Sequence, residues 1–103
     1  MRTPILGLIA CGLAALAGPA QADAELAKKH NCVACHHQER KMLGPAFKDI
    51  AAKYTADPSA VQTLVKSIRE GSVGVWGQLP MPAQPQVSEA DALTLAKYVL
   101  TIK

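Results

Sequence analysis

The chain of 103 residues carries a formal net charge of +3 and contains one Phe, two Tyr, one Trp and three Cys. A chain of this length forms one domain with a marginal core, which needs a further stabilising element. The small charge predicts no nucleic-acid partner, and three cysteines are too few for a disulfide framework.

Residues 1–22 have the layout of a secretory signal peptide. Arg2 provides a positive start, an apolar run follows over residues 5–17, and Ala20-Gln21-Ala22 forms a small-x-small cleavage site. The apolar run is shorter than the about 20 residues that a membrane span requires. We therefore predict cleavage after Ala22, which leaves residues 23–103 as a periplasmic domain without stable membrane insertion.

A lipoprotein signal is an alternative for this leader, because Leu8-Ile9-Ala10-Cys11 resembles a bacterial lipoprotein cleavage box. It is less favoured, because cleavage there would leave a very short signal followed by a second apolar stretch. Removal of residues 1–22 takes away one charged side chain, Arg2, so the remaining domain has a net charge of +2.

The segment Cys32-Val33-Ala34-Cys35-His36 has the C-x-x-C-H pattern of a c-type haem attachment site. Two thiols separated by two residues can reach the two vinyl groups along one porphyrin edge and form thioethers. The imidazole of His36 then lies under the ring, where it can bind the iron as the proximal ligand. A covalently attached haem c would also supply the apolar centre that so short a chain lacks.

Two other kinds of site share part of this pattern. A thiol–disulfide pair normally lies at the start of a helix that follows a strand, and the sequence shows no strand pattern. A zinc site needs two further ligands, and His30 and His37 are too close in sequence to complete a tetrahedron comfortably. We expect both histidines to be surface residues. Cys11 lies in the leader.

Four helices are predicted from apolar periodicity and boundary signals. The first extends from Asp23 to about Asn31 and runs into the haem motif. A proline at the first helical position, where its missing N–H costs nothing, marks the start of each of the next two. The boundary residues are Pro45 for the second helix, Pro58 and Gly71 for the third, and Ser88 for the fourth.

Residues 71–87 form a long loop, rich in Gly and Pro, between the last two predicted helices. Loops of this length in small domains are usually functional, and this loop can cover the haem face opposite His36. Met81 lies between two prolines, and its thioether is a soft iron ligand. We predict Met81 as the sixth ligand. The competing Met42 follows His36 too closely to reach the opposite face.

With these features, the sequence resembles the class I c-type cytochromes, and in particular the short bacterial cytochrome c-551/c-552 group. Besides CVACH, the resemblance rests on residues 41–54, 71–77, 80–82 and 95–100. It implies an all-α fold, the small monohaem cytochrome c fold, with about four helices wrapped around one covalently attached haem c. It also implies that Cys32 and Cys35 form the thioethers and that His36 and Met81 are the axial ligands.

The resemblance assigns roles to further residues. The Pro45 carbonyl would accept the Nδ1–H of His36, and Trp76 would donate its indole N–H to a haem propionate, the alternative being a core aromatic. Relatives often carry a basic residue where this chain has Ser67, which leaves the propionate counter-charge open. Gln84 is a candidate hydrogen-bond donor to the Met81 sulfur.

Two saturated axial positions leave the iron no site for a substrate, so the resemblance implies an electron carrier and not an enzyme. The implied protein is a monomeric, periplasmic one-electron shuttle. Its donor would be a quinol–cytochrome c reductase-type complex, and its acceptor a nitrite reductase or a cytochrome oxidase-type enzyme. The alternative is a haem-based sensor or ligand-binding protein with a labile sixth ligand.

Overall fold

The computed structural model describes residues 2–4, 7 and 18–103. In this part of the chain, the helices are α1 (Pro19–Lys29), α2 (Phe47–Tyr54), α3 (Ala60–Glu70) and α4 (Glu89–Leu100), with a short 3-10 helix, η1 (Cys32–Ala34), between α1 and α2. The only strand-like pairing among the described residues is an isolated bridge between Ser72 and Met81. The predicted all-α fold of about four helices is confirmed.

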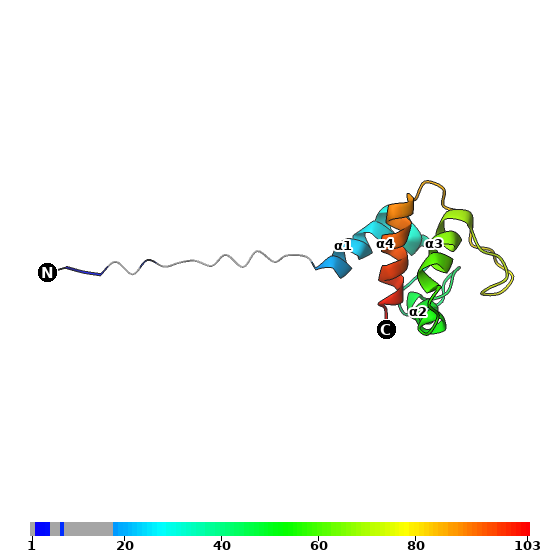
Figure 1. The fold of residues 1–103 in the computed structure, drawn as a ribbon, viewed down its shortest axis with the longest axis horizontal. Helices are drawn as coiled ribbons and strands as arrows, with labels where there is room; N and C mark the ends of the chain where they lie inside the picture. The colour runs from blue at the N-terminus through cyan, green and yellow to red at the C-terminus, as the bar shows by residue number, and fades with distance from the viewer. Residues whose placement is uncertain (1, 5–6, 8–17) are drawn as a thin grey trace.

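Helix α4 is the centre of the domain, because α1, α2 and α3 each pack against it (Figure 1). The rings of Phe47 and Tyr98 meet edge to face with their centroids 6.3 Å apart, an arrangement that aromatic rings favour. Half of the twelve buried hydrophobic residues in the described part of the chain are alanines, so the helices approach closely but bury little apolar surface. The main core cluster consists of Ala27, Phe47, Ile50, Val87, Ala92, Leu95, Tyr98 and Val99.

The predicted starts of the second and third helices are wrong by about two residues. Helix α2 begins at Phe47, so Pro45 precedes the helix instead of opening it. Helix α3 begins at Ala60, because Asp57 first forms a turn of its own. The carboxylate Oδ1 of Asp57 accepts a hydrogen bond from the Ser59 backbone N–H at 2.8 Å, which is the geometry of an Asx-turn.

The other boundary predictions for the last two helices are confirmed. Helix α3 ends at Gly71, which has φ = +86°, a conformation that favours glycine. Helix α4 is capped by Ser88, whose Oγ accepts a hydrogen bond from the Asp91 N–H at 3.1 Å. Both signals act within a few residues of the boundary, which is why the sequence predicts them correctly.

Helix α1 begins at Pro19, four residues before the predicted first residue of the mature domain, Asp23. Cleavage after Ala22 would therefore remove the first turn of this helix and leave an acidic residue at the new start, which the helix dipole favours. Most of the predicted signal peptide, including Cys11, lies outside the described residues, so its removal stays a prediction. Among the described residues, no helix has the length and apolar content to cross a membrane.

The prediction that His30 is a surface residue is wrong. Its side chain is only 11 % exposed, and its Nε2 lies 2.9 Å from Oδ2 of Asp91. The contact joins the end of α1, immediately before the haem motif, to the first turn of α4. It therefore connects two segments that are 61 positions apart in the sequence.

Replacement of His30 by leucine should destabilise the domain by about 1–2 kcal/mol, because the partly buried Asp91 carboxylate would lose its partner. Urea unfolding of the haem-loaded protein, followed by circular dichroism, measures this loss. The control is Lys28→Ala, which breaks the exposed Lys28–Glu25 ion pair on the same helix and should cost less than about 0.5 kcal/mol. Equal losses of unfolding free energy in both variants would show that the His30–Asp91 contact stabilises the domain no more than an exposed ion pair does.

Candidate haem site

Backbone and ring contacts fix the orientation of His36. Its Nδ1 lies 2.8 Å from the Pro45 carbonyl oxygen, which can only accept, so this nitrogen carries the proton and donates. The imidazole also stacks on the ring of Phe47, with the centroids 5.2 Å apart and an interplanar angle of 23°. Because Nδ1 is engaged, Nε2 is the nitrogen that remains able to bind a metal.

Gly44 lies directly against the imidazole of His36. A Cβ atom at this position would lie 2.5 Å from Cε1 and 2.8 Å from Nδ1 of the ring. The N–H of Gly44 donates to the Cys35 carbonyl at 2.8 Å, which connects the segment around Gly44 to the haem motif. The backbone at position 44 approaches His36 so closely that only a residue without a side chain fits there.

Cys32, the first residue of η1, and Cys35, which directly follows η1, are free, half-buried thiols. Burial raises the pKa of the Cys32 thiol, a backbone hydrogen bond opposes this in part, and the nearby Cys35 reinforces it. The attacking cysteine of a thiol oxidoreductase has a lowered pKa instead, so the geometry disfavours that alternative. Within the described part of the chain, no three His, Cys, Asp or Glu side chains gather in a way that could hold a metal ion.

Met81 lies at the base of the loop formed by residues 71–87. Its backbone pairs with that of Ser72 through two hydrogen bonds, Ser72 N to Met81 O at 3.0 Å and Met81 N to Ser72 O at 2.9 Å. The loop extends from this base away from the helices (Figure 1). The backbone of Met81 is thus held beside the end of α3 and is not carried on the loop tip.

The competing Met42 belongs to the same side of the site as His36. Its N–H donates to the Gly44 carbonyl at 3.0 Å, and Gly44 lies against the imidazole. The Met42 side chain is 40 % exposed. This placement favours Met81 over Met42 for the face opposite His36.

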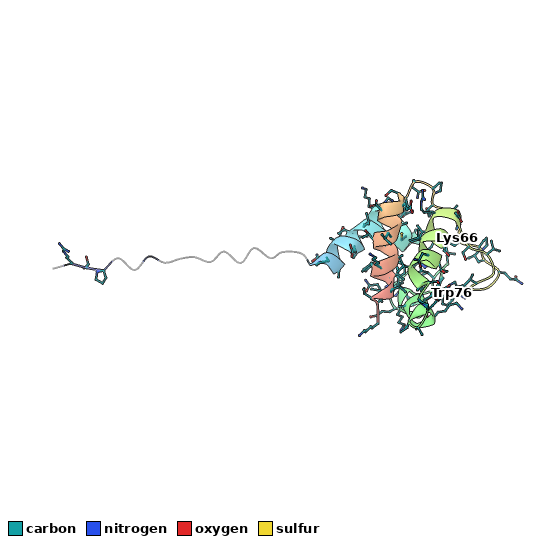
Figure 2. All side chains as sticks on the ribbon, viewed as in Figure 1. Lys66 and Trp76 are labelled. Atoms are coloured by element: carbon teal, nitrogen blue, oxygen red, sulfur yellow. The ribbon has the colours of Figure 1, made fainter. Side chains whose placement is uncertain are left out.

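Trp76 is 40 % exposed, so the alternative that it is a core aromatic is wrong. The ammonium group of Lys53 lies 5.5 Å from the centroid of its ring. Figure 2 shows Trp76 near the lower end of α3, close to α2. The loop of residues 71–87 therefore brings Trp76 close to Lys53, near the end of α2.

The residues around these groups leave an apolar surface uncovered. Among the described residues, seven of the eight large hydrophobic residues that are exposed belong to the haem motif, to the segment that follows it or to the loop of residues 71–87: Val33, Met42, Leu43, Val73, Val75, Trp76 and Leu79. Exposed apolar side chains gathered in a few segments are typical of a site that binds an apolar group. Together with two free thiols and an imidazole with an available Nε2, this surface fits the chemistry of haem c.

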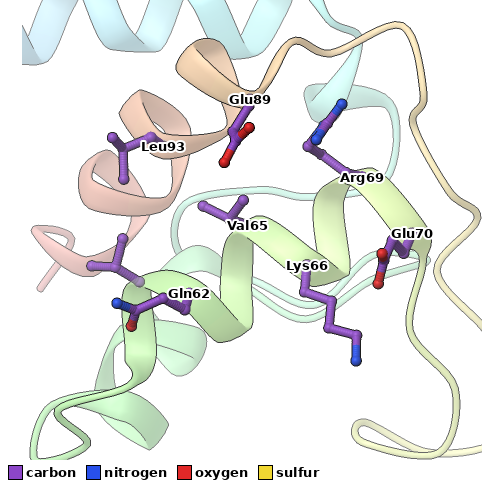
Figure 3. A pocket seen from close by; sticks show the side chains of 8 residues that line it. Gln62, Val65, Lys66, Arg69, Glu70, Glu89 and Leu93 are labelled. Carbon is purple, nitrogen blue, oxygen red and sulfur yellow. The ribbon is translucent and has the colours of Figure 1, made fainter.

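A groove between α3 and α4 is separate from this site (Figure 3). It has a volume of about 570 Å³, and none of the predicted haem residues lines it. Arg69 faces this groove, and its Nε donates to the Val87 carbonyl at 3.3 Å. Arg69 therefore does not take the place of the basic residue that is absent at Ser67.

The hydrogen bond predicted between Gln84 and the Met81 sulfur is not formed in this structure. The Gln84 amide nitrogen donates to the Pro82 carbonyl at 3.2 Å, and its oxygen accepts from the Gln86 amide at 2.8 Å. The Gln84 backbone N–H donates to the Ile68 carbonyl at 2.9 Å. Gln84 thus stabilises the return of the loop toward α4.

Residues 20–103 match the family model of cytochrome c. The chain belongs to the cytochrome c family. It is 54 % identical to cytochrome c-552 of Nitrosomonas europaea over the full length of both chains. It is 46 % identical to cytochrome c-551 of Pseudomonas aeruginosa, over 96 % of this chain and 95 % of that relative. The crystal structure of wild-type Nitrosomonas europaea cytochrome c552 matches with a TM-score of 0.76 and 56 % identity, over 78 % of this chain and 99 % of that one.

The predicted resemblance is therefore confirmed: the chain is a class I c-type cytochrome of the c-551/c-552 group. Cytochromes of this family carry one covalently attached haem c and transfer electrons without catalysing a reaction of their own, and the same holds for this chain.

Replacement of Gly44 by alanine should displace the imidazole of this cytochrome and lower its free energy of unfolding by about 1–3 kcal/mol, the usual cost of overpacking. The visible spectrum and urea unfolding of the haem-loaded variant measure both effects. Leu43→Ala is the control, because Leu43 is 63 % exposed and adjoins Gly44. If Gly44→Ala matches this control, the close approach to His36 is not a constraint.

Proposed function

We propose that this cytochrome is a periplasmic one-electron carrier in which His36 and Met81 are the two axial ligands and Cys32 and Cys35 hold the haem covalently. The bound haem supplies an iron that alternates between two oxidation states. The observation that carries the proposal is the hydrogen bond from His36 Nδ1 to the Pro45 carbonyl, which fixes the tautomer and makes Nε2 the metal-binding atom.

A second fixed point supports the same assignment. The pairing of Met81 with Ser72 holds the backbone of the proposed sixth ligand beside α3. Ligands that are positioned before the electron arrives need little rearrangement when the charge on the iron changes. Such a site suits electron transfer better than the binding of an external ligand, which would require a labile sixth position.

The proposal that the chain is exported depends on its predicted signal peptide, residues 1–22. The family match begins at residue 20, after the apolar segment of the leader. We propose that the exported protein begins at Asp23, and N-terminal sequencing of the periplasmic fraction tests this. A lipid-modified terminus at Cys11, or an intact leader, would contradict it.

The proposed partners are a quinol-oxidising complex as donor and a terminal reductase or oxidase, such as nitrite reductase, as acceptor. Exposed Val33 and Leu43 lie in and just after the haem motif, and exposed lysines such as Lys28, Lys41 and Lys48 accompany them. Lysines around an apolar contact surface can steer an acidic partner and make the association rate depend on salt.

The visible absorption spectrum tests the axial ligands and separates the carrier from the sensor alternative. We expect thioether-haem bands, the weak far-red band of Met bound to Fe(III), and no change on addition of CO. A high-spin spectrum that shifts with CO would instead support a haem-based sensor. The absence of a Soret band from protein matured in a haem-attaching host would exclude both.

A further inference from the structure

Lys53 places a positive charge where two aromatic faces converge. It lies near the end of α2, and its Nζ is 5.9 Å from the ring centroid of Tyr54 and 5.5 Å from that of Trp76. A cation within about 6 Å of an aromatic face is attracted by the ring. The two rings come from α2 and from the loop of residues 71–87, so the ammonium connects these segments.

No carboxylate of the described chain pairs with this ammonium. The ion pairs found within residues 2–4, 7 and 18–103 are Lys28–Glu25 and His30–Asp91, neither of which involves Lys53. Trp76 lies beside the same cation, its ring is 40 % exposed, and its indole carries an N–H donor. A cation and an N–H donor placed together form a suitable receptor for a carboxylate.

Haem c carries two propionate carboxylates, which need positive partners where they are shielded from water. Helix α3 offers none at Ser67, and the two basic residues at its C-terminal end, Lys66 and Arg69, line the separate groove between α3 and α4 (Figure 3). Lys53 is the basic residue that the structure places beside Trp76.

We propose that Lys53 is the counter-charge of a haem propionate and that it binds this carboxylate together with the indole N–H of Trp76. The inference rests on the proposed function, because it needs the haem to occupy the side of the domain on which Trp76 lies. In this chain, α2 thus supplies the charge that Ser67 on α3 does not. The positive charge of Lys53 disfavours Fe(III) and so raises the reduction potential.

The test is voltammetry of the haem-loaded variants at one pH and low ionic strength. Lys53→Gln should lower the equilibrium constant for reduction about three- to tenfold, as expected for one charge at protein-like screening. Lys53→Arg keeps the charge and should restore the wild-type value. The matched control is Lys48→Gln, which removes an equally exposed charge from the same helix and should change the constant less than about twofold.

A double-mutant cycle separates a shared propionate from a general charge effect. Trp76→Phe keeps an aromatic face for Lys53 but removes the N–H, so its effect should not add to that of Lys53→Gln. Equal shifts for Lys53→Gln and Lys48→Gln, or full additivity with Trp76→Phe, would overturn the proposal. The far-red band of the wild-type protein reports the proposed axial ligands independently, so an intact band with no Lys53 effect would reject this inference alone.

Discussion

Replacement of Met81 by alanine should abolish the weak far-red band of the ferric protein and lower the reduction potential by roughly a few tenths of a volt. A thioether stabilises Fe(II) relative to Fe(III), and the choice of axial ligands moves haem potentials over about 0.8 V. The loss of the sixth ligand should also allow CO to bind the reduced iron. Absorption spectra with and without CO, combined with voltammetry, measure all three effects.

Met42→Ala is the matched control for this experiment. Met42 is 40 % exposed, and its N–H donates to the Gly44 carbonyl, beside His36. We expect this variant to keep the far-red band, the potential and the resistance to CO. If Met42→Ala loses the band and Met81→Ala retains it, the proposed ligand is wrong and the loop of residues 71–87 has another role.

The double variant Cys32→Ala/Cys35→Ala, purified without haem, should be largely unfolded. Six of the twelve hydrophobic residues found buried within residues 18–103 are alanines, so the helices alone bury little apolar surface. Larger side chains such as Leu64 and Ile68 pack against the core cluster but are only partly buried. A domain of this size seldom compensates for so small a core without a cofactor or cross-link.

Far-ultraviolet circular dichroism of this variant measures its helix content. The control is the single variant Cys32→Ala matured with haem, which should keep one thioether and most of the helix signal. Native helix content in the haem-free double variant would show that the four helices form a stable domain on their own, and the haem would then be functional without being structural.

Local features of the sequence determined much of this protein. The C-x-x-C-H motif, the glycine after α3 and the serine cap of α4 act within a few residues, so each can be interpreted without knowledge of the packing. The all-α class follows in the same way from apolar periodicity. The hydrogen bond from His36 to the Pro45 carbonyl agrees with what the family resemblance implies. The expectation that Pro45 opens α2 is wrong, because the helix begins two residues later, at Phe47.

Contacts between distant segments were decided only by the tertiary structure. The sequence around His30 predicts an exposed polar residue, yet the packing of α1 on α4 brings it to Asp91, 61 positions away. Lys53 and Trp76 meet because the course of the loop formed by residues 71–87 places the Trp76 ring near the end of α2. Neither pairing has a sequence signature, because the spacing of such residues depends on how whole helices pack and not on the local backbone.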